Sequence, residues 1–234
     1  MGSKIQNLKD LEKKEDIGQY EVDTVVVTQN NMTIYPEALL SCRNTRFLHA
    51  SINKLVIIPS LGKYKHLTVC DLSNNRITAF PVGVIACRGL KILDVSGNRL
   101  KCLSLKLSEC TKLRVVRASD NFIEEFPAVL FDLKLIDTIS LRNNLIKVLP
   151  ARIGTLRCLR VLLMQQNKLM TIPFSIVNTS IGEPGGKLRL DMNNLVPTLR
   201  DCYLAYGTQG LLDMITNSEP KELFRILEKE LKEM

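Results

Sequence analysis

The residues best suited to acid–base or nucleophilic chemistry are few and far apart in the sequence. The chain has two histidines, His49 and His66, and neither has a serine or cysteine near it in a triad-like pattern. Asp71 and Asp94 are the carboxylates that an acid–base pair would use, but carboxylate catalysis needs an enclosed site. We therefore assign no catalytic residue and predict that the protein is not an enzyme.

Cysteine usage argues against metal and redox sites. The chain has seven cysteines, an odd number, and none of them forms the paired CxxC spacing of metal sites or redox centres. Reduced thiols in a reducing compartment are the simpler interpretation. We therefore expect no metal and no cofactor.

The N-terminus bears on the cellular location. It carries Lys and Glu where a secretory signal needs an apolar run, and no stretch of the chain approaches the roughly 18 consecutive apolar residues of a membrane helix. We therefore expect a cytoplasmic protein. Gly2 is a candidate for myristoylation, although Gln6 stands where that signal has Ser or Thr, and an ordinary start of the chain is the alternative.

One asparagine recurs through most of the chain at intervals of 23, 22, 23, 23, 23, 23 and 26 residues. The apolar residues around it follow the template L-x-x-L-x-L-x-x-N-x-L-x-x-L-P, for example in residues 67–81. Such regularity indicates a repeat architecture, in which each copy buries its apolar face only against its neighbours. The asparagines that define repeats one to eight are Asn30, Asn53, Asn75, Asn98, Asn121, Asn144, Asn167 and Asn193.

This template resembles that of the leucine-rich-repeat family, in its intracellular subclass with repeats of roughly 23 residues. The resemblance implies an α/β solenoid, with a curved parallel β-sheet on the concave face and an irregular or helical convex side. An open concave face also argues against an enclosed catalytic site at Asp71 and Asp94. Within the repeat, the asparagine amide can satisfy backbone groups at the turn.

Three of the cysteines occupy one repeat position. Cys42, Cys87 and Cys110 each lie eleven residues before the asparagine of their repeat, where other copies have Tyr or Leu. This is a core position, so we expect these cysteines to fill the convex interior as small apolar side chains.

We divide the chain into an N-terminal helical cap (1–21), eight leucine-rich repeats (22–197) and a C-terminal helical cap (198–234), because a solenoid exposes its core at both ends unless it is capped. Ile5, Leu8 and Leu11 have helical spacing in the first cap. In the last cap we expect two helices, the second with Ser218 as N-cap; a partner-binding role for it is the alternative.

The concave face is the predicted binding surface. One ladder across it is apolar, and a second ladder mixes carboxylates with cations; the alternative for the apolar ladder is that β-branched residues simply suit strands. Flanking cations at Arg46, Lys91, Arg114 and Arg160 form a basic rim, or else an ordinary solvated edge. The residues predicted to contact a partner are Phe47, His49, Val69, Asp71, Ile92, Asp94, Val115, Arg117 and Arg142.

We therefore predict a non-enzymatic scaffold or adaptor that binds a protein partner; the resemblance adds small GTPases and phosphatases as partner classes. The net charge of +8 and pI of about 9.2 keep open an electrostatic binder of anionic membrane or nucleic acid. Nucleic acid is not favoured, because Trp is absent and no aromatic-rich basic motif appears. Membrane contact is expected only if Gly2 is lipidated. A structural subunit of a larger assembly is a third possibility.

Overall fold

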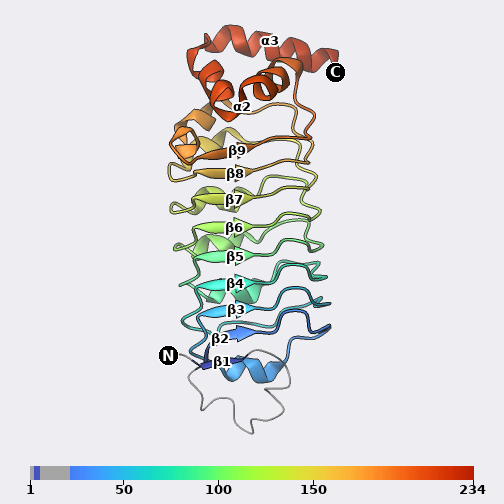
Figure 1. Ribbon diagram of the computed structural model, residues 1–234, viewed down its shortest axis with the longest axis vertical. Helices are drawn as coiled ribbons and strands as arrows, with labels where there is room; N and C mark the ends of the chain where they lie inside the picture. Colours follow the sequence, from blue (N-terminus) through green and yellow to red (C-terminus); the bar gives the residue numbers. More distant parts are fainter. Residues whose placement is uncertain (1–2, 6–21) are drawn as a thin grey trace.

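The structure, a computed structural model, describes residues 3–5 and 22–234. These residues form an elongated solenoid in which one parallel sheet runs from the N-terminal end to the C-terminal helices (Figure 1). Its nine strands follow one another in chain order. The strands are β1 (Ser3–Ile5), β2 (Val22–Val26), β3 (Phe47–His49), β4 (Val69–Asp71), β5 (Ile92–Asp94), β6 (Val115–Arg117), β7 (Thr138–Ser140), β8 (Val161–Leu163) and β9 (Lys187–Arg189).

Strands β3 to β9 pair without a register shift, so equivalent repeat positions lie side by side. In each of the strands β3 to β9 the middle side chain is buried, as at Leu48, Leu93 and Leu162. The residues on either side of it face the other way, because successive side chains alternate across a strand. This alternation is the one expected from the L-x-L segment of the template.

Among the described residues, the convex side carries a short 3₁₀ helix in repeat one and in each of repeats three to seven, whereas repeat two has none. Most of them have a proline as the N-cap residue, where the missing N–H removes no hydrogen bond of the helix. Ser104 replaces proline before η4 and accepts a hydrogen bond from the backbone N–H of Lys106 at 3.3 Å. The helices are η2 (Glu37–Ser41), η3 (Val82–Ala86), η4 (Leu105–Glu109), η5 (Ala128–Asp132), η6 (Ala151–Thr155) and η7 (Phe174–Asn178), with the additional η8 (Ser180–Gly182).

The repeated asparagines form a hydrogen-bonded ladder beside the sheet, which confirms their scaffold role. Asn98 Nδ2 donates to the carbonyls of Val95 and Leu72, the first in its own repeat and the second in the preceding one, both at 3.0 Å. Asn98 Oδ1 accepts from the backbone N–H of Ile77 at 3.0 Å. The residue before each asparagine has a positive φ, which glycine supplies at Gly97 with φ 64°.

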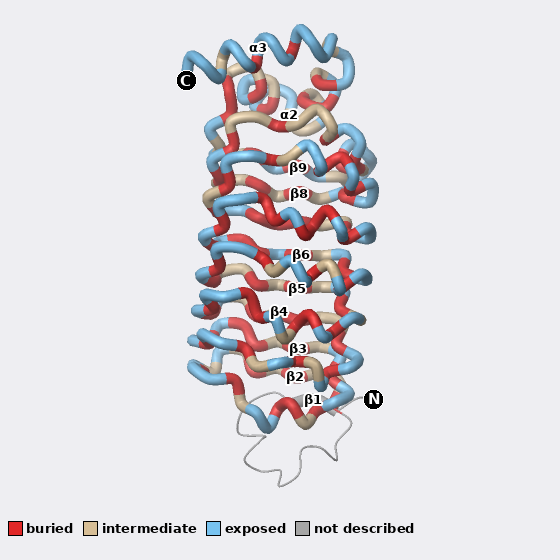
Figure 2. The backbone as a smooth tube through the Cα atoms, turned by 180° about the vertical axis from the view of Figure 1, so that it is seen from behind, coloured by how far each residue is buried: buried red, intermediate tan, exposed pale blue. Residues whose placement is uncertain are grey.

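The core is continuous from the first repeat to the C-terminal helices. Figure 2 shows buried segments in every coil of the solenoid and exposed segments at its turns. Cys42, Cys87 and Cys110 are buried, as their repeat position predicts. Tyr64 takes the same position in repeat three, where its hydroxyl donates to the Leu39 carbonyl at 2.8 Å and is paired with the Tyr35 hydroxyl at 2.8 Å.

The N-terminal end differs from the predicted helix where the structure describes it. Ile5 lies in β1, which pairs in parallel with β2, so the sheet continues past the first repeat. The expected helix is therefore wrong at Ile5. Leu8 and Leu11, like Gly2 and Gln6, lie outside the described residues.

Both expected C-terminal helices are present, as α2 (Pro197–Asn217) and α3 (Pro220–Glu233). They cover the last repeat (Figure 1). The predicted N-cap of the second helix is wrong. Ser218 is the C-cap of α2, and Glu219 is the N-cap of α3, without a side-chain cap hydrogen bond; Pro220 follows it as the first helical residue, a position that suits proline.

Helix α2 also closes the open edge of the sheet at β9. The Tyr203 hydroxyl accepts from the backbone N–H of Leu190 at 3.2 Å, and the Thr208 hydroxyl donates to the Leu188 carbonyl at 2.9 Å. Edge strands with unpaired backbone groups invite pairing with other chains. These two side chains give the last strand hydrogen-bond partners that a further repeat would otherwise supply.

Candidate protein-binding face

The two predicted ladders lie next to each other on the concave face, on either side of the buried strand centres. Strand pairing places Phe47 beside Val69, then Ile92 and Val115, and all four side chains are half-buried. The same pairing places His49 beside Asp71, then Asp94 and Arg117. The sequence therefore predicted the positions of these eight residues correctly; their contact with a partner stays a prediction.

The two neighbouring carboxylates of the second ladder are each compensated by a nearby cation or donor. Asp71 Oδ2 lies 3.8 Å from His49 Nδ1, and Asp94 Oδ2 lies 3.9 Å from Arg117 Nη1. Asp71 Oδ1 accepts from the backbone N–H of Ser73, and Asp94 Oδ1 accepts from the backbone N–H of Ser96, both at 3.0 Å. The carboxylates are thus held in fixed orientations, flanked by a histidine and an arginine that remain partly exposed.

Arg142 and the basic rim occupy the edges of the same face. Arg142 follows β7 by two residues, and its Nε donates to Gln166 Oε1 at 2.8 Å. The Arg46 guanidinium stands 5.8 Å from the centre of the Phe47 ring, a cation–π distance. Arg160 Nη2 donates to the Pro184 carbonyl at 2.5 Å. The rim arginines are therefore exposed but partly ordered by neighbouring residues.

The arrangement offers binding rather than an enclosed reaction site. Asp71 and Asp94 lie on an open sheet face, and His66 is exposed outside both ladders. Among residues 3–5 and 22–234, no group of three or more His, Cys, Asp or Glu side chains is placed to hold a metal ion.

The buried thiols give a direct test of the core. Burial raises the pKa of the Cys87 thiol to about 12 and that of the Cys110 thiol to about 11, and it raises the pKa of Cys70 as well. Because the thiolate is the reactive form, these thiols should react with iodoacetamide at pH 8 over a hundredfold more slowly than the exposed Cys102 and Cys158.

Mass spectrometry of time-quenched samples measures these alkylation rates. In denaturant, where burial is lost, the rates should converge. Equal rates for Cys70 and Cys102 in the folded protein would contradict the packing described for repeat three.

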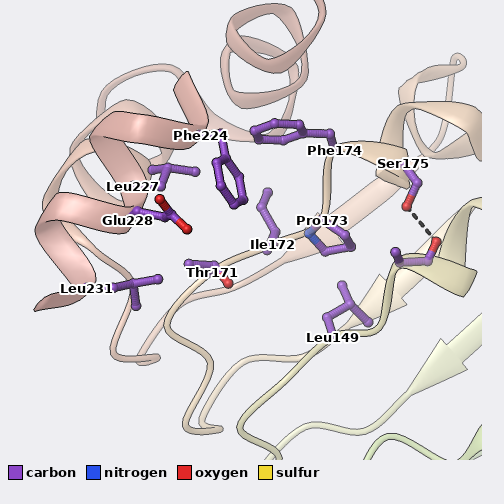
Figure 3. Close-up of a pocket in the computed structure, with 11 residues that line it drawn as sticks. Leu149, Thr171, Ile172, Pro173, Phe174, Ser175, Phe224, Leu227, Glu228 and Leu231 are labelled. Atoms are coloured by element: carbon purple, nitrogen blue, oxygen red, sulfur yellow. Dashed lines mark hydrogen bonds between the residues drawn. The ribbon is translucent and has the colours of Figure 1, made fainter. Parts of the chain in front are cut away.

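Two apolar hollows were missed by reasoning from the sequence. One, of about 400 Å³, lies between α3 and repeats six and seven, with Phe224, Leu227 and Leu231 facing Ile172 and Phe174 (Figure 3). The other, of about 430 Å³, lies on the side of repeats one and two. Both are lined by residues from the L-x-x-L-P part of the template, whose variable positions point outward. Apolar residues at those variable positions are the sequence signal from which the two hollows could have been predicted.

The described chain thus has the leucine-rich-repeat fold: one parallel sheet, an asparagine ladder and a convex side of short helices. No protein-family model matches the sequence, and no curated protein matches it. Beyond the repeat template, the likeness of this chain to known proteins is therefore a likeness of fold.

Solved structures with the same fold include an internalin of Listeria monocytogenes, with a TM-score of 0.68 and 15% identity over 88% of this chain and 63% of that one. A leucine-rich-repeat protein of Leptospira interrogans has a TM-score of 0.64 and 22% identity over 79% of this chain and 53% of that one.

A third structure is the ectodomain of the membrane receptor kinase GASSHO1/SCHENGEN3 of Arabidopsis thaliana, in complex with CASPARIAN STRIP INTEGRITY FACTOR 2. It has a TM-score of 0.65 and 24% identity over 76% of this chain and 22% of that one. The chain therefore spans less than two thirds of the length of each of these three proteins. Among the residues that the structure describes, no helix combines the length and apolarity needed to cross a membrane.

Proposed function

We propose that this protein is a non-enzymatic scaffold that binds a protein partner through the concave face of repeats two to five. The observation that carries the proposal is the row of four half-buried apolar side chains, from Phe47 to Val115, on an open sheet face. Covering apolar area of this kind with a partner lowers the free energy of the complex. The neighbouring charged ladder would fix the orientation of that partner.

Two proteins of the same fold were solved with a bound partner, which supports a binding role in general. The Arabidopsis ectodomain was solved with CASPARIAN STRIP INTEGRITY FACTOR 2 bound, and the plant receptor RGFR1 was solved with RGF2. For the present chain we propose a cytoplasmic partner, in line with its odd number of cysteines, which favours reduced thiols. A small GTPase or a phosphatase is implied only by the family resemblance, and no contact in the structure singles out either class.

Reversing the charges at the centre of the face tests the proposal. The double variant Asp94→Arg, Arg117→Asp should lower partner recovery in affinity capture at least about tenfold, because it inverts the pattern that orients the partner. Lys106→Glu is the matched control, because Lys106 is exposed on the convex helix η4. Circular dichroism checks that each variant is folded.

The same experiment has an outcome that would overturn the proposal. If the charge-reversed protein folds and captures the same partners in the same amounts, the concave face is not the binding surface. Titration with anionic vesicles and with RNA at two ionic strengths separates the electrostatic alternative, which requires a steep loss of binding with salt.

A further inference from the structure

A row of cations lies outside the concave face, on the side of the solenoid just beyond the asparagine ladder. Lys54, Arg76 and Arg99 each follow the asparagine of repeats two, three and four, and all three are exposed. Within the described part of the chain, no carboxylate lies within ion-pair distance of any of them. We call these three residues the lateral basic row.

The backbone holds this row in place. The N–H of Lys54 donates to the Met32 carbonyl at 2.8 Å, that of Arg76 to Leu55 at 2.9 Å, and that of Arg99 to Ile77 at 2.9 Å. Successive rungs of a parallel sheet are about 5 Å apart, so the backbone places the three cationic residues side by side. Like charges at this spacing repel one another, which makes the row unfavourable unless an anion compensates it.

The apolar hollow on the side of repeats one and two adjoins the row. Val56, Ile57 and Pro59, which follow Lys54 in the chain, form one wall of it, and Ile34 of repeat one forms another. Ile34 is 80% exposed and Ile57 is 77% exposed, a large apolar surface for a folded protein to leave in water. Glu37, in η2, also lines the hollow. The side of repeats one to four thus combines an apolar pocket with a row of uncompensated cations.

We propose that this side is a second docking site, for an acidic helical segment of a protein partner that places an aliphatic side chain in the pocket and its carboxylates along the lateral basic row. Glutamates three or four residues apart on a helix are about 5–6 Å apart, close to the spacing of the row. The site is separate from the proposed concave site and does not depend on it.

Charge along the same side favours a narrow protein segment over an anionic membrane. In repeat five the positions equivalent to Val56 and the neighbouring pocket residue Ile57 are Glu124 and Glu125, both exposed. A flat anionic surface would have to approach these carboxylates, whereas a short helix on repeats one to four would end before them.

The test uses a fluorescein-labelled helical peptide, acetyl-LLAEAAAEAAAEA-amide, and its glutamine counterpart, in fluorescence anisotropy titrations. The glutamate peptide should bind at least about tenfold more tightly than the glutamine peptide. Arg76→Glu together with Arg99→Glu, or Ile57→Ser alone, should each weaken binding at least about tenfold. All three positions are exposed, so these changes leave the core intact.

Matched controls occupy the same repeat positions far from the site. Lys168→Glu corresponds to Arg76→Glu, and Val148→Ser, at a side chain that is 66% exposed, corresponds to Ile57→Ser. Both should leave binding unchanged, as should the concave double variant of Asp94 and Arg117. Loss of binding in any of these three variants would overturn the proposal, because the peptide would then be recognising the net charge of the protein or its concave face.

Vesicles containing 30% phosphatidylserine complete the test. Tighter binding to vesicles than to the glutamate peptide, lost in the Arg76 and Arg99 variant, would replace the acidic segment by a membrane and overturn the proposal. Equal affinity for the two peptides, or no binding of either, would also overturn it.

Discussion

Replacing Asn98 by alanine should lower the free energy of unfolding by about 3 kcal/mol and Tm by roughly 6–12 °C. Its side chain accepts from the Ile77 N–H and donates to the carbonyls of Leu72, Val95 and Ser96 at 3.0–3.2 Å. Alanine leaves these groups unpaired at a site where Asn98 is only 6% exposed. A buried amide without a partner costs about 1–3 kcal/mol.

Asn30→Ala is the control for this prediction. Asn30 holds the same position in repeat one, but within residues 3–5 and 22–234 its Nδ2 donates to the nearby Thr28 carbonyl alone, at 2.8 Å, and the residue is half-buried. We expect a loss below about 1 kcal/mol. Urea unfolding followed by circular dichroism measures both variants. Equal losses would mean that the asparagine side chain acts only within its own turn and that bonds between repeats contribute little.

The asparagine ladder also explains why so much of the fold was readable from the sequence. From Asn53 onward each asparagine bridges two repeats, so one side chain about every 23 residues fixes both the turn and the register of the next strand. Once the register is fixed, the residues before and after each buried strand centre must lie on the concave face. The placement of Asp71 beside Asp94, and of Asp94 beside Arg117, follows directly from this periodicity.

The features that the sequence did not reveal lie where the periodicity ends or changes. At the N-terminus, the spacing of Ile5, Leu8 and Leu11 suits a helix, but Ile5 pairs with β2 because an open sheet edge offers unsatisfied backbone groups. At the C-terminus, the helix boundary depends on Pro220 rather than on Ser218.

The lateral basic row was missed for a different reason. Its members are not noticeable as a cluster in the sequence, because they are separated by 22 and 23 residues and each follows a conspicuous asparagine. Aligning the repeats on that asparagine and reading the next position would have found Lys54, Arg76 and Arg99. Their lack of carboxylate neighbours among the described residues required the structure.

The second large expected effect concerns the outer helix. Leu227→Asp should release α3 and speed amide hydrogen exchange in residues 220–233 at least about a hundredfold, with Tm of the repeats lowered by less than about 3 °C. Leu227 is 5% exposed and packs against the last repeats beside Phe224 and Leu231. An unpaired carboxylate buried at this position loses its hydration, so the state with α3 undocked has a lower free energy than the docked state.

The repeats should be little affected because α2, and not α3, is bonded to the end of the sheet. Helix α2 is bonded to β9 through Tyr203 and Thr208, so it continues to cover the end of the core when α3 leaves. Helix α3 is tied to α2 through Glu230, whose carboxylate accepts from the Thr198 hydroxyl at 2.7 Å and from its N–H at 3.2 Å.

Ile226→Asp is the control, because Ile226 lies on the same helix with 43% of its surface exposed and should tolerate a charge. If Leu227→Asp instead unfolds the whole solenoid, α3 belongs to the cooperative unit and its role is structural. If α3 alone is released and the protein then self-associates in size-exclusion chromatography, the uncovered face around Ile172 and Phe174 is a surface that α3 normally shields. In a repeat protein each unit contacts only its neighbours, so an outer helix held by one groove and one carboxylate can detach without unfolding the repeats beneath it.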